Sequence, residues 1–307
     1  MVSTWLNGLV SGTVFVPAVY FAGGQNAGGS KVATVDKFEC SGDSRTTLGT
    51  GLSAANRGLA GAANSGVAMY FAGGLAPGIV ATVDKFLFSD DSRSTLGTGL
   101  SAAVYIAAGA ANSGTAAYFA GGASGPVATV NKFAFSDDSR TTLGTGLSAA
   151  TQGLGGAANS GTAAYFAGGS AGGEVATVDK FAFSDDGRTT LGTGLSAARN
   201  YPAGAANSGT AAYFAGGYLS GQVATVDKFA FSDDSRTTLG TGLSAARQYL
   251  AGAANSGTAA YFGGGYEPSV VATVDKFAFS DDSRTTLGTG LSAATFALAG
   301  AADSGTL

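Results

Sequence analysis

One sequence unit recurs six times along this chain at an almost constant spacing, and this repeat restricts the fold more than any other feature. Successive Thr-Leu-Gly motifs are separated by 48, 47, 48, 48 and 48 residues. A Tyr-Phe pair before Gly-Gly recurs with steps of 50, 48, 47, 48 and 48 residues. The leucines are Leu48, Leu96, Leu143, Leu191, Leu239 and Leu287, and the tyrosines are Tyr20, Tyr70, Tyr118, Tyr165, Tyr213 and Tyr261. Because each unit is too short to bury its own apolar face, we expect the copies to pack in a regular array.

Each copy contains four short runs that are typical of β-strands. In the copy 199–246 these runs are 203–206, 210–215, 223–231 and 236–239. Asn-Ser-Gly, Gly-Gly and Ser-Asp-Asp-Ser sequences end the first three runs, and such sequences favour turns. No part of the unit has a helical apolar period of sufficient length. The sequence therefore predicts an all-β fold of four-stranded antiparallel units.

Six such units can form a closed β-propeller or an open β-solenoid. The chain enters its first unit just before the second strand and ends just after a first strand, at 300–304. Pairing of this C-terminal first strand with the N-terminal second strand at 19–22 would close the ring and leave no free sheet edge. A solenoid would need polar capping repeats, and none is visible. We therefore predict a single six-bladed propeller over 15–307.

The N-terminal segment 1–14 is expected to be an extension or a relic strand. It contains the single tryptophan, Trp5, in a Ser-Thr-Trp-Leu-Asn-Gly-Leu sequence that is similar to the fourth strand of a unit. Because the segment lacks a basic n-region, we expect mature protein here rather than a signal peptide.

The unit resembles the Kelch repeat of β-propellers, because a Tyr-bearing second strand is followed by Gly-Gly and then by Ala-Thr-Val-Asp-Lys-Phe. The resemblance covers nearly the whole chain. It departs from the Kelch pattern on the fourth strand, where Kelch repeats usually carry Trp and this chain has Thr or Ser. The Ser-Asp-Asp-Gly-Arg-Thr sequence at 184–189 is also similar to the Asp-box turn of sialidase-like propellers. In those families this turn is structural, so the similarity implies fold rather than activity.

Composition excludes several classes of protein. Charged residues make up 12% of the chain and hydrophobic residues 45%, which is too apolar for a disordered protein. The 51 glycines do not recur every third residue, so the chain is not a collagen. A net charge of −4 argues against a nucleic-acid partner, and no run of 18 apolar residues is present to span a membrane.

Two absences restrict the chemistry. The chain has no histidine and a single cysteine, Cys40. Histidine-based catalytic triads, the usual zinc sites and an intramolecular disulfide are therefore excluded. We expect a monomer with no metal, no cofactor, no nucleic-acid partner and no membrane association.

Several repeated positions are expected to build the framework. Phe181 and Phe183 lie two residues apart on one strand, so they point to one face and should pack between blades. Cys40 replaces the second of these phenylalanines in the first copy, and we interpret it as a small buried hydrophobic residue. Gly and Ala in the first strand would let six strands converge on an axis.

The third strand also repeats an Asp-Lys pair, whose side chains point to opposite faces of the blade. The pair forms either a ring of contacts between blades, such as Lys180 with Asp227, or two solvated charges near the rim. In the first case Asn131 would interrupt the ring once. The Asp-Asp-Ser-Arg turn that follows is interpreted as an Asx turn rather than a calcium site, because it lacks a ligand-rich loop.

The copies differ from one another chiefly in two segments. One follows Gly-Leu-Ser-Ala-Ala and links each unit to the next, and the other follows Gly-Gly between the second and third strands. In an antiparallel blade both connections lie at the same end, so we expect all of them on one face of the disc, called here the variable face. The near-invariant Asn-Ser-Gly and Ser-Asp-Asp-Ser turns should lie on the opposite face.

The variable face carries the candidate ligand-binding residues. All five tyrosines and all three arginines outside the repeated motifs fall on it, and Tyr and Arg are enriched at binding hot spots. The alternative is that freely varying loops accumulated these residues without a ligand. The candidates are Arg57, Tyr105, Arg199, Tyr201, Tyr218, Arg247, Tyr249, Tyr266, Glu267 and Phe296.

Three functions remain open. The first is a non-catalytic module that binds a glycan or a peptide on the variable face, as Kelch-like propellers commonly bind partners. The second is a structural repeat protein, recently amplified or designed, with no specific ligand. An enzyme is not expected, because a glycosidase-like site would need more carboxylates than Glu174 and Glu267 near this face. The copper oxidases that share Kelch repeats need histidine ligands.

Overall fold

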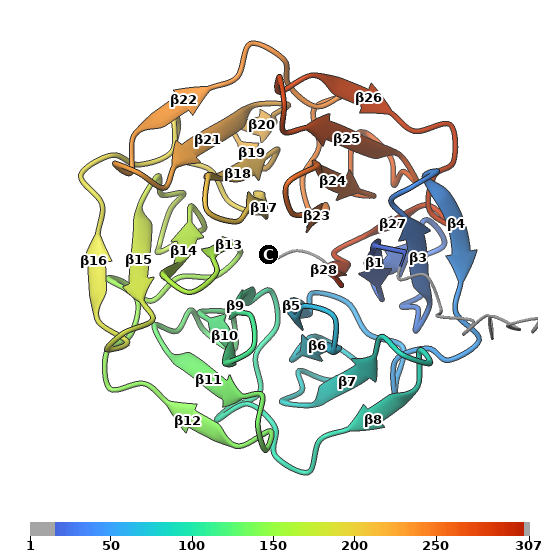
Figure 1. Ribbon diagram of the computed structural model, residues 1–307, viewed down its shortest axis with the longest axis horizontal. Helices are drawn as coiled ribbons and strands as arrows, with labels where there is room; N and C mark the ends of the chain where they lie inside the picture. The colour runs from blue at the N-terminus through green and yellow to red at the C-terminus, as the bar shows by residue number, and fades with distance from the viewer. Residues whose placement is uncertain (1–15, 304–307) are drawn as a thin grey trace, which may run out of the picture.

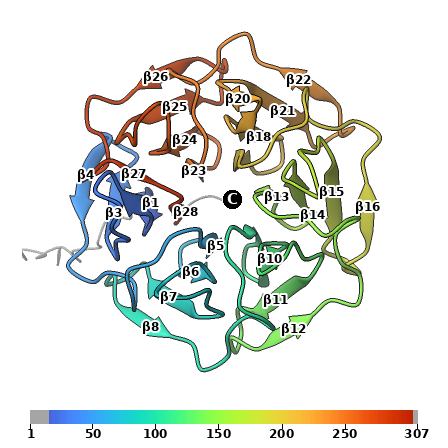
Figure 2. The same ribbon diagram turned by 180° about the vertical axis from the view of Figure 1, so that it is seen from behind.

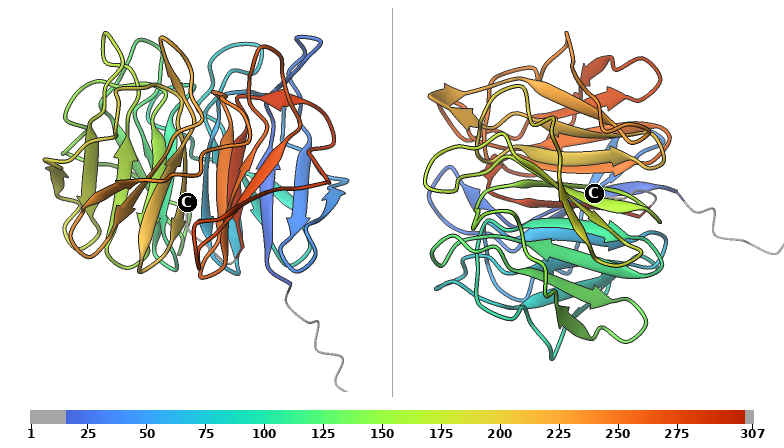
Figure 3. Two further views of the ribbon diagram at one scale, coloured as in Figure 1. Left: turned by 90° about the horizontal axis from the view of Figure 1, so that it is seen from above. Right: turned by 90° about the vertical axis from the view of Figure 1, so that its left-hand side faces the viewer.

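A computed structural model describes residues 16–303, which form a ring of six four-stranded antiparallel sheets (Figure 1). The blades follow one another around the axis in chain order, as the view from behind also shows (Figure 2). The side views show strands running between the two faces of a disc (Figure 3). The predicted six-bladed propeller is confirmed, whereas the expectation for 1–14 concerns residues outside the described range.

The four strands of each blade follow the chain from the axis outward, except that the innermost strand of blade 1 comes from the C-terminal part of the chain. Blades are numbered here from 1 to 6 by the chain order of their second strands. The innermost strands are β28 (Ala299–Ala302), β5 (Ala60–Asn64), β9 (Ala108–Asn112), β13 (Gly155–Asn159), β17 (Ala203–Asn207) and β23 (Ala251–Asn255). The second strands are β1 (Ala18–Ala22), β6 (Ala68–Ala72), β10 (Ala116–Ala120), β14 (Ala163–Ala167), β18 (Ala211–Ala215) and β24 (Ala259–Gly263). The third strands are β3 (Val35–Glu39), β7 (Val83–Leu87), β11 (Val130–Ala134), β15 (Val178–Ala182), β21 (Val226–Ala230) and β25 (Val274–Ala278). The outermost strands are β4 (Ser44–Thr47), β8 (Arg93–Thr95), β12 (Arg140–Thr142), β16 (Arg188–Thr190), β22 (Arg236–Thr238) and β26 (Arg284–Thr286). Short additional strands are β2 (Gln25–Asn26), β19 (Tyr218–Leu219), β20 (Gly221–Gln222) and β27 (Thr295–Phe296).

Blade 1 closes the ring by joining the two ends of the chain. Strand β28 pairs antiparallel with β1, from Val19 opposite Ala302 to Ala22 opposite Ala299. Beyond this ladder, the carboxylate of Asp303 accepts a hydrogen bond of 2.7 Å from the Ala18 N–H. The other five copies carry asparagine at the position of Asp303. No hairpin connects β28 to β1, so this side-chain contact adds a tie between the two ends where the other blades have a turn.

The innermost strands approach one another so closely that their second residue must be glycine. A Cβ added to Gly156 would clash with the carbonyl oxygen of Gly109, and one added to Gly61 would clash with that of Gly300. The same clash with the preceding blade occurs at every member of the ring, Gly61, Gly109, Gly156, Gly204, Gly252 and Gly300. The prediction that small residues allow six strands to converge is therefore confirmed.

Aromatic side chains fill the spaces between blades. Phe181 of blade 4 is fully buried in a cluster that includes Tyr118 of blade 3, and the Phe183 ring lies 5.1 Å from the Tyr118 ring. The interblade position of both phenylalanines is as predicted. Cys40 is 8% exposed, and burial raises the pKa of its thiol to about 12, so it is a neutral buried group as expected.

Lysines do bridge successive blades, but to a different aspartate from the one predicted. Lys180 Nζ lies 2.8 Å from Asp234 Oδ2 in the β21–β22 turn of the next blade, and Tyr165 donates a hydrogen bond to Oδ1 of the same carboxylate. Asp227, the predicted partner, instead accepts hydrogen bonds from the N–H and hydroxyl of Ser196. The lysine bridges are Lys37–Asp91, Lys85–Asp138, Lys132–Asp186, Lys180–Asp234, Lys228–Asp282 and Lys276–Asp43. Asn131 interrupts nothing, because its strand contributes only Lys132 to this ring.

The Asp-Asp-Ser turns have the expected Asx geometry. Asp233 Oδ1 accepts a hydrogen bond of 3.0 Å from the Ser235 N–H. Asp234 adopts a left-handed conformation with φ of 57°, which Asp tolerates better than most residues. Asp234, the left-handed residue, is also the one that pairs with the lysine of the preceding blade. The turn therefore contributes to the contact between blades.

Candidate functional site

The two variable segments are direct neighbours on one face of the ring. In each connection between blades, one residue pairs through its backbone with the residue that follows Gly-Gly in the blade that the connection enters. These antiparallel pairs are Arg57 with Leu75, Tyr105 with Ala123, Gln152 with Ser170, Asn200 with Tyr218, Gln248 with Tyr266, and Phe296 with Gln25. The prediction that both segments share the variable face is therefore confirmed.

Each connection contains a run of three residues, here called the crossover triplet, whose members lie in three different environments. The triplets are 56–58, 104–106, 151–153, 199–201, 247–249 and 295–297. The backbone carbonyl of the first member accepts a hydrogen bond from the Gly-Gly segment, as Arg199 does from Gly169 at 2.9 Å. The second member forms the backbone pair described above, and the third lies at the axis.

The third members form a ring with left-handed backbones. Their φ angles lie between 52° and 66° in all six blades. Backbone hydrogen bonds link neighbours around the axis, for example from the Tyr201 N–H to the Gly153 carbonyl at 2.7 Å and from the Ala297 N–H to the Tyr249 carbonyl at 2.8 Å. The members are Gly58, Ile106, Gly153, Tyr201, Tyr249 and Ala297. A left-handed backbone is costly for residues other than Gly, and most of all for a β-branched residue such as Ile106.

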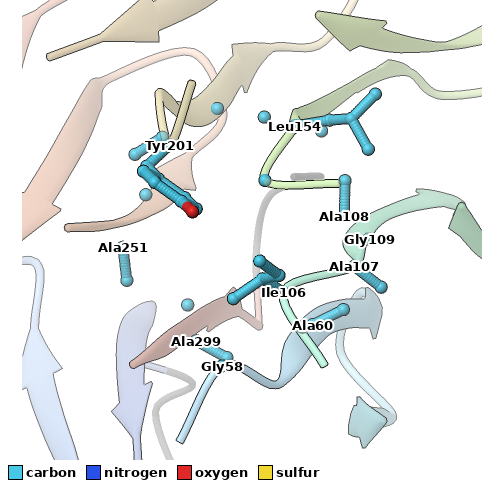
Figure 4. Close-up of a pocket in the computed structure, with 18 of the residues that line it drawn as sticks. Gly58, Ala60, Ile106, Ala107, Ala108, Gly109, Leu154, Tyr201, Ala251 and Ala299 are labelled. Carbon is cyan, nitrogen blue, oxygen red and sulfur yellow. The ribbon is translucent and has the colours of Figure 1, made fainter. Parts of the chain in front are cut away.

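This ring surrounds the mouth of a cavity on the axis, called here the axial funnel. The funnel has a volume of about 600 Å³, including the part that opens to solvent, and its wall continues down to the glycine ring of the innermost strands. Its upper wall carries Ile106, Leu154 and Tyr201, and Figure 4 shows Ile106 and Tyr201 pointing inward from different blades. Tyr249, Leu59, Leu250 and Leu298 also line the funnel, and most of the remaining wall is Gly and Ala.

Aromatic side chains form a continuous row beside the funnel mouth. The Tyr201 and Tyr249 rings are stacked with centroids 3.8 Å apart, and Tyr249 meets Phe296 edge-on at 5.8 Å. Phe296 in turn contacts Tyr266 at 6.1 Å, and the Arg57 guanidinium lies 5.9 Å from the Phe296 ring centre. This row, called the aromatic row, brings together five of the predicted site residues from blades 5, 6, 1 and 2.

The pKa of the Tyr249 phenol is raised, first because the ring is buried and second because it is hydrogen-bonded to Tyr201. A phenol of raised pKa stays neutral at ordinary pH and can donate and accept hydrogen bonds. The aromatic row therefore offers flat apolar faces together with neutral hydroxyl groups.

Arg199 and Arg247 do not belong to the exposed site, which corrects the expectation from sequence. They are 1% and 0% exposed, and their guanidinium groups lie 2.8 and 3.0 Å from Asp227 and Asp275. As the first members of their crossover triplets they point into the space between blades rather than to solvent. Burial lowers the pKa of both arginines, and the neighbouring carboxylates oppose this effect.

Three other predicted residues lie on the variable face outside the aromatic row. Tyr105 is partly buried beside Gly58, where a Cβ would come within 3.4 Å of its ring. Tyr218 begins the short hairpin of β19 and β20. Glu267 is partly exposed, and its charge acts on the buried guanidinium of Arg247.

Sequence reasoning missed the rest of the funnel rim. Gly58, Ile106, Gly153 and Ala297 were not among the candidates, although they are equivalent to Tyr201 and Tyr249. A signal was present, because two of the six copies carry glycine at this position and glycine favours a positive φ. The other four copies carry Ile, Tyr, Tyr and Ala at this position, so glycine is not a constant feature of the repeat there.

No protein-family model matches this chain, and no curated protein matches it either. Within residues 16–303, no group of three or more His, Cys, Asp or Glu side chains is placed to hold a metal ion. The same part of the chain contains no helix long and apolar enough to cross a membrane. What the fold and the site define is a six-bladed propeller with an axial funnel and an aromatic row on its variable face.

Proposed function

We propose that this protein is a non-catalytic binding module whose ligand, a glycan or a peptide, is held on the variable face over the axial funnel. The observation that carries the proposal is the aromatic row. Stacked rings offer flat apolar surface at little conformational cost, and tyrosine hydroxyls add hydrogen bonds to polar ligand groups. Arg57, beside Phe296, supplies a positive charge at the same place.

The strained backbone of the funnel rim supports the same proposal. Tyr201 and Tyr249 have φ angles of 55° and 56°, although glycine serves at the equivalent positions Gly58 and Gly153. Residues held in an unfavourable conformation cluster at functional sites, because the side chain is needed there despite the cost. The Kelch-like features of the repeat agree with this reading, since Kelch-like propellers commonly bind partners through loops on one face.

A structural role without a ligand is the second candidate. It is favoured by the lysine bridges, which join all six blades and engage side chains of the invariant part of the repeat. An enzyme is not proposed, because Glu267 is the single carboxylate among the ten candidate residues and the chain has no histidine.

The test compares the wild type with the double variant Tyr201→Gly/Tyr249→Gly on a glycan array and on peptide libraries. Because Gly58 and Gly153 occupy equivalent positions, the double variant should keep the backbone of the rim. We expect the wild type to bind one ligand class, and the double variant to bind it at least about tenfold more weakly. The matched control is Gln152→Ala/Ser170→Ala, a backbone-paired couple on the same face but outside the aromatic row, which should bind as the wild type does.

Two outcomes contradict the proposal in different ways. If the wild type binds neither glycans nor peptides, the structural role is preferred. If the double variant binds as tightly as the wild type, the ligand does not use the aromatic row.

A further inference from the structure

The six blades contain six equivalent sites between the first member of a crossover triplet and the third strand, and their occupants differ. In blade 5 this site holds the Arg199 guanidinium, whose Nη1 donates to Asp227 Oδ2 at 2.8 Å and whose Nη2 donates to the Phe214 carbonyl at 3.1 Å. In blade 6 the Arg247 Nη2 donates to the Phe262 carbonyl at 3.0 Å and lies 3.0 Å from Asp275 Oδ2. The site is thus built for a guanidinium group by one carboxylate and one backbone carbonyl.

In blades 4 and 1 the same position carries a threonine that does not fill the site. The Thr151 hydroxyl turns back to the Ala149 carbonyl at 2.9 Å, and the Thr295 hydroxyl does the same with Ala293. Neither threonine donates to the aspartate of its blade. The space that an arginine side chain fills in blades 5 and 6 is left as a cavity in these two blades.

The two cavities enclose about 250 Å³ and 280 Å³, including the part that opens to solvent. The first is lined by Asp179, Phe166 and Ser148, and the second by Asp36, Phe21 and Ser292. These residues are equivalent to Asp227, Phe214 and Ser196 around Arg199. Each cavity therefore presents the carboxylate and the phenylalanine residue that hold a guanidinium group in the sister blades.

The aspartate in each cavity is already oriented. Asp179 Oδ2 accepts hydrogen bonds from the N–H and hydroxyl of Ser148 at 2.7 and 2.8 Å, and Oδ1 accepts one from Thr190. Asp227 has the same three partners in its own blade and still binds Arg199. The donors already present thus leave room for a guanidinium contact.

Blade 3 has no aspartate at this position of the third strand and no arginine at the start of its triplet. There the triplet begins with the buried Val104 and the third strand carries Asn131, so an apolar residue and a neutral amide take the two positions. In blade 2 the Asn56 amide fills the position and donates to the Gly73 carbonyl. Within this internal series, both arginines face an aspartate, and the one apolar residue faces no carboxylate.

We propose that the cavities at Asp179 and Asp36 are binding sites for a guanidinium group, carried by a small guanidine compound or by an arginine side chain of a peptide. The route of entry is the variable face, because exposed residues of the connection, Ser148 with Ala149 and Ser292 with Ala293, line the two cavities. The proposal is independent of the aromatic row, because no residue of that row lines either cavity, whereas Leu154 and Leu298 each line one cavity and the axial funnel.

The experiment titrates the protein with ethylguanidinium, with ethylammonium of equal charge, and with a short flexible peptide containing one arginine, using calorimetry and a crystal soaked with ethylguanidinium. The wild type should take up two equivalents of ethylguanidinium with a dissociation constant of about 1 mM, with electron density at Asp179 and Asp36. Ethylammonium should bind at least about tenfold more weakly, because it cannot contact the carboxylate and the carbonyl together. Binding of the peptide as well would identify arginine side chains as a source, whereas binding of ethylguanidinium alone would restrict the ligand to small guanidine compounds.

Two variants make the test specific. Thr151→Arg/Thr295→Arg copies the residues found in blades 5 and 6, so it should fold, unfold at a higher temperature than the wild type, and bind no ethylguanidinium. Asp36→Asn/Asp179→Asn copies Asn131, so it should fold and bind at least about tenfold more weakly. The proposal is overturned if the arginine variant still binds or loses stability, if ethylammonium binds equally well, or if the wild type binds neither guanidine source.

Discussion

At the scale of the residue, the position within the crossover triplet decides whether a side chain lies at the funnel rim or is buried between blades. Arg199, Asn200 and Tyr201 are consecutive, yet the first is buried against Asp227, the second pairs with Tyr218, and the third lies at the funnel rim. Because the three residues are consecutive, the sequence can place the whole triplet on the variable face but cannot tell which of its three side chains is buried and which is exposed. The left-handed third residue turns the chain, and the type of residue in this copy, Tyr201, does not reveal that turn; only the glycines of two other copies, Gly58 and Gly153, point to it.

At the funnel rim, we predict that replacing a residue by glycine stabilises the protein. Ala297 has a φ of 55°, so Ala297→Gly should raise the free energy of unfolding by about 1 kcal/mol, because glycine adopts this backbone without steric cost. Urea unfolding monitored by circular dichroism measures the change. Ala253→Gly, in the buried strand β23, is the matched control and should lower the free energy of unfolding by about 1 kcal/mol. A loss of similar size at both positions would contradict the argument.

At the scale of the element, each blade is joined to the next by side chains of its second and third strands. Tyr165 in β14 and Lys180 in β15 both reach Asp234 in the turn of the following blade. The sequence left open whether the repeated lysine bridges two blades or is solvated; the structure shows a bridge, but to Asp234 rather than to Asp227. The physical reason is that the carboxylate of Asp227 already accepts hydrogen bonds from Ser196. The carboxylate of Asp234 can reach the lysine only because its turn has a left-handed backbone at this residue.

A double-mutant cycle tests this assignment. Lys180→Met and Asp234→Asn should show a coupling free energy of about 1 kcal/mol, because the pair is only partly shielded from water. Asparagine is chosen because it tolerates the left-handed backbone of Asp234. The parallel cycle of Lys180→Met with Asp227→Asn should show no coupling. The reverse result would restore the contact predicted from the strand pattern.

At the scale of the whole molecule, the pKa values of the buried titratable groups predict that the free energy of unfolding is constant over a broad pH range. Burial alone would raise the pKa of Asp227, but hydrogen bonds from Thr238 and Ser196 and the charge of Arg199 hold this pKa below its ordinary value. The pKa of each of the six tyrosines of the Tyr-Phe pairs is raised, first by burial and then by a neighbouring blade's aspartate or, for Tyr261, by Cys40 and Asp43. The chain has no histidine to titrate between these groups.

The direction of each effect follows from these pKa values. A carboxyl with a lowered pKa stabilises the fold above its unfolded value near 4, and this contribution is lost as the pH falls through the folded value. A phenol with a raised pKa stabilises the fold below its unfolded value near 10, and this contribution is lost as the pH rises further. The free energy of unfolding should therefore be constant between about pH 5 and 8 and should fall below about pH 4 and above about pH 10. Urea unfolding at pH 3, 6.5 and 10.5 checks this, and a marked loss between pH 5 and 8 would contradict it.

The number of blades, the closure of the ring and the face that carries the variable segments were all predictable, because they depend on the period of the repeat and on the alternation of antiparallel strands. Both are properties of local sequence, repeated six times without exception. The burial of Arg199 and Arg247, the stacking of Tyr201 on Tyr249, and the pairing of Lys180 with Asp234 were decided only by tertiary structure. Each of these depends on a backbone angle or on a segment tens of residues away, such as the 54 residues that separate Lys180 from Asp234. The repeat shows where such residues recur, but not which of them come into contact.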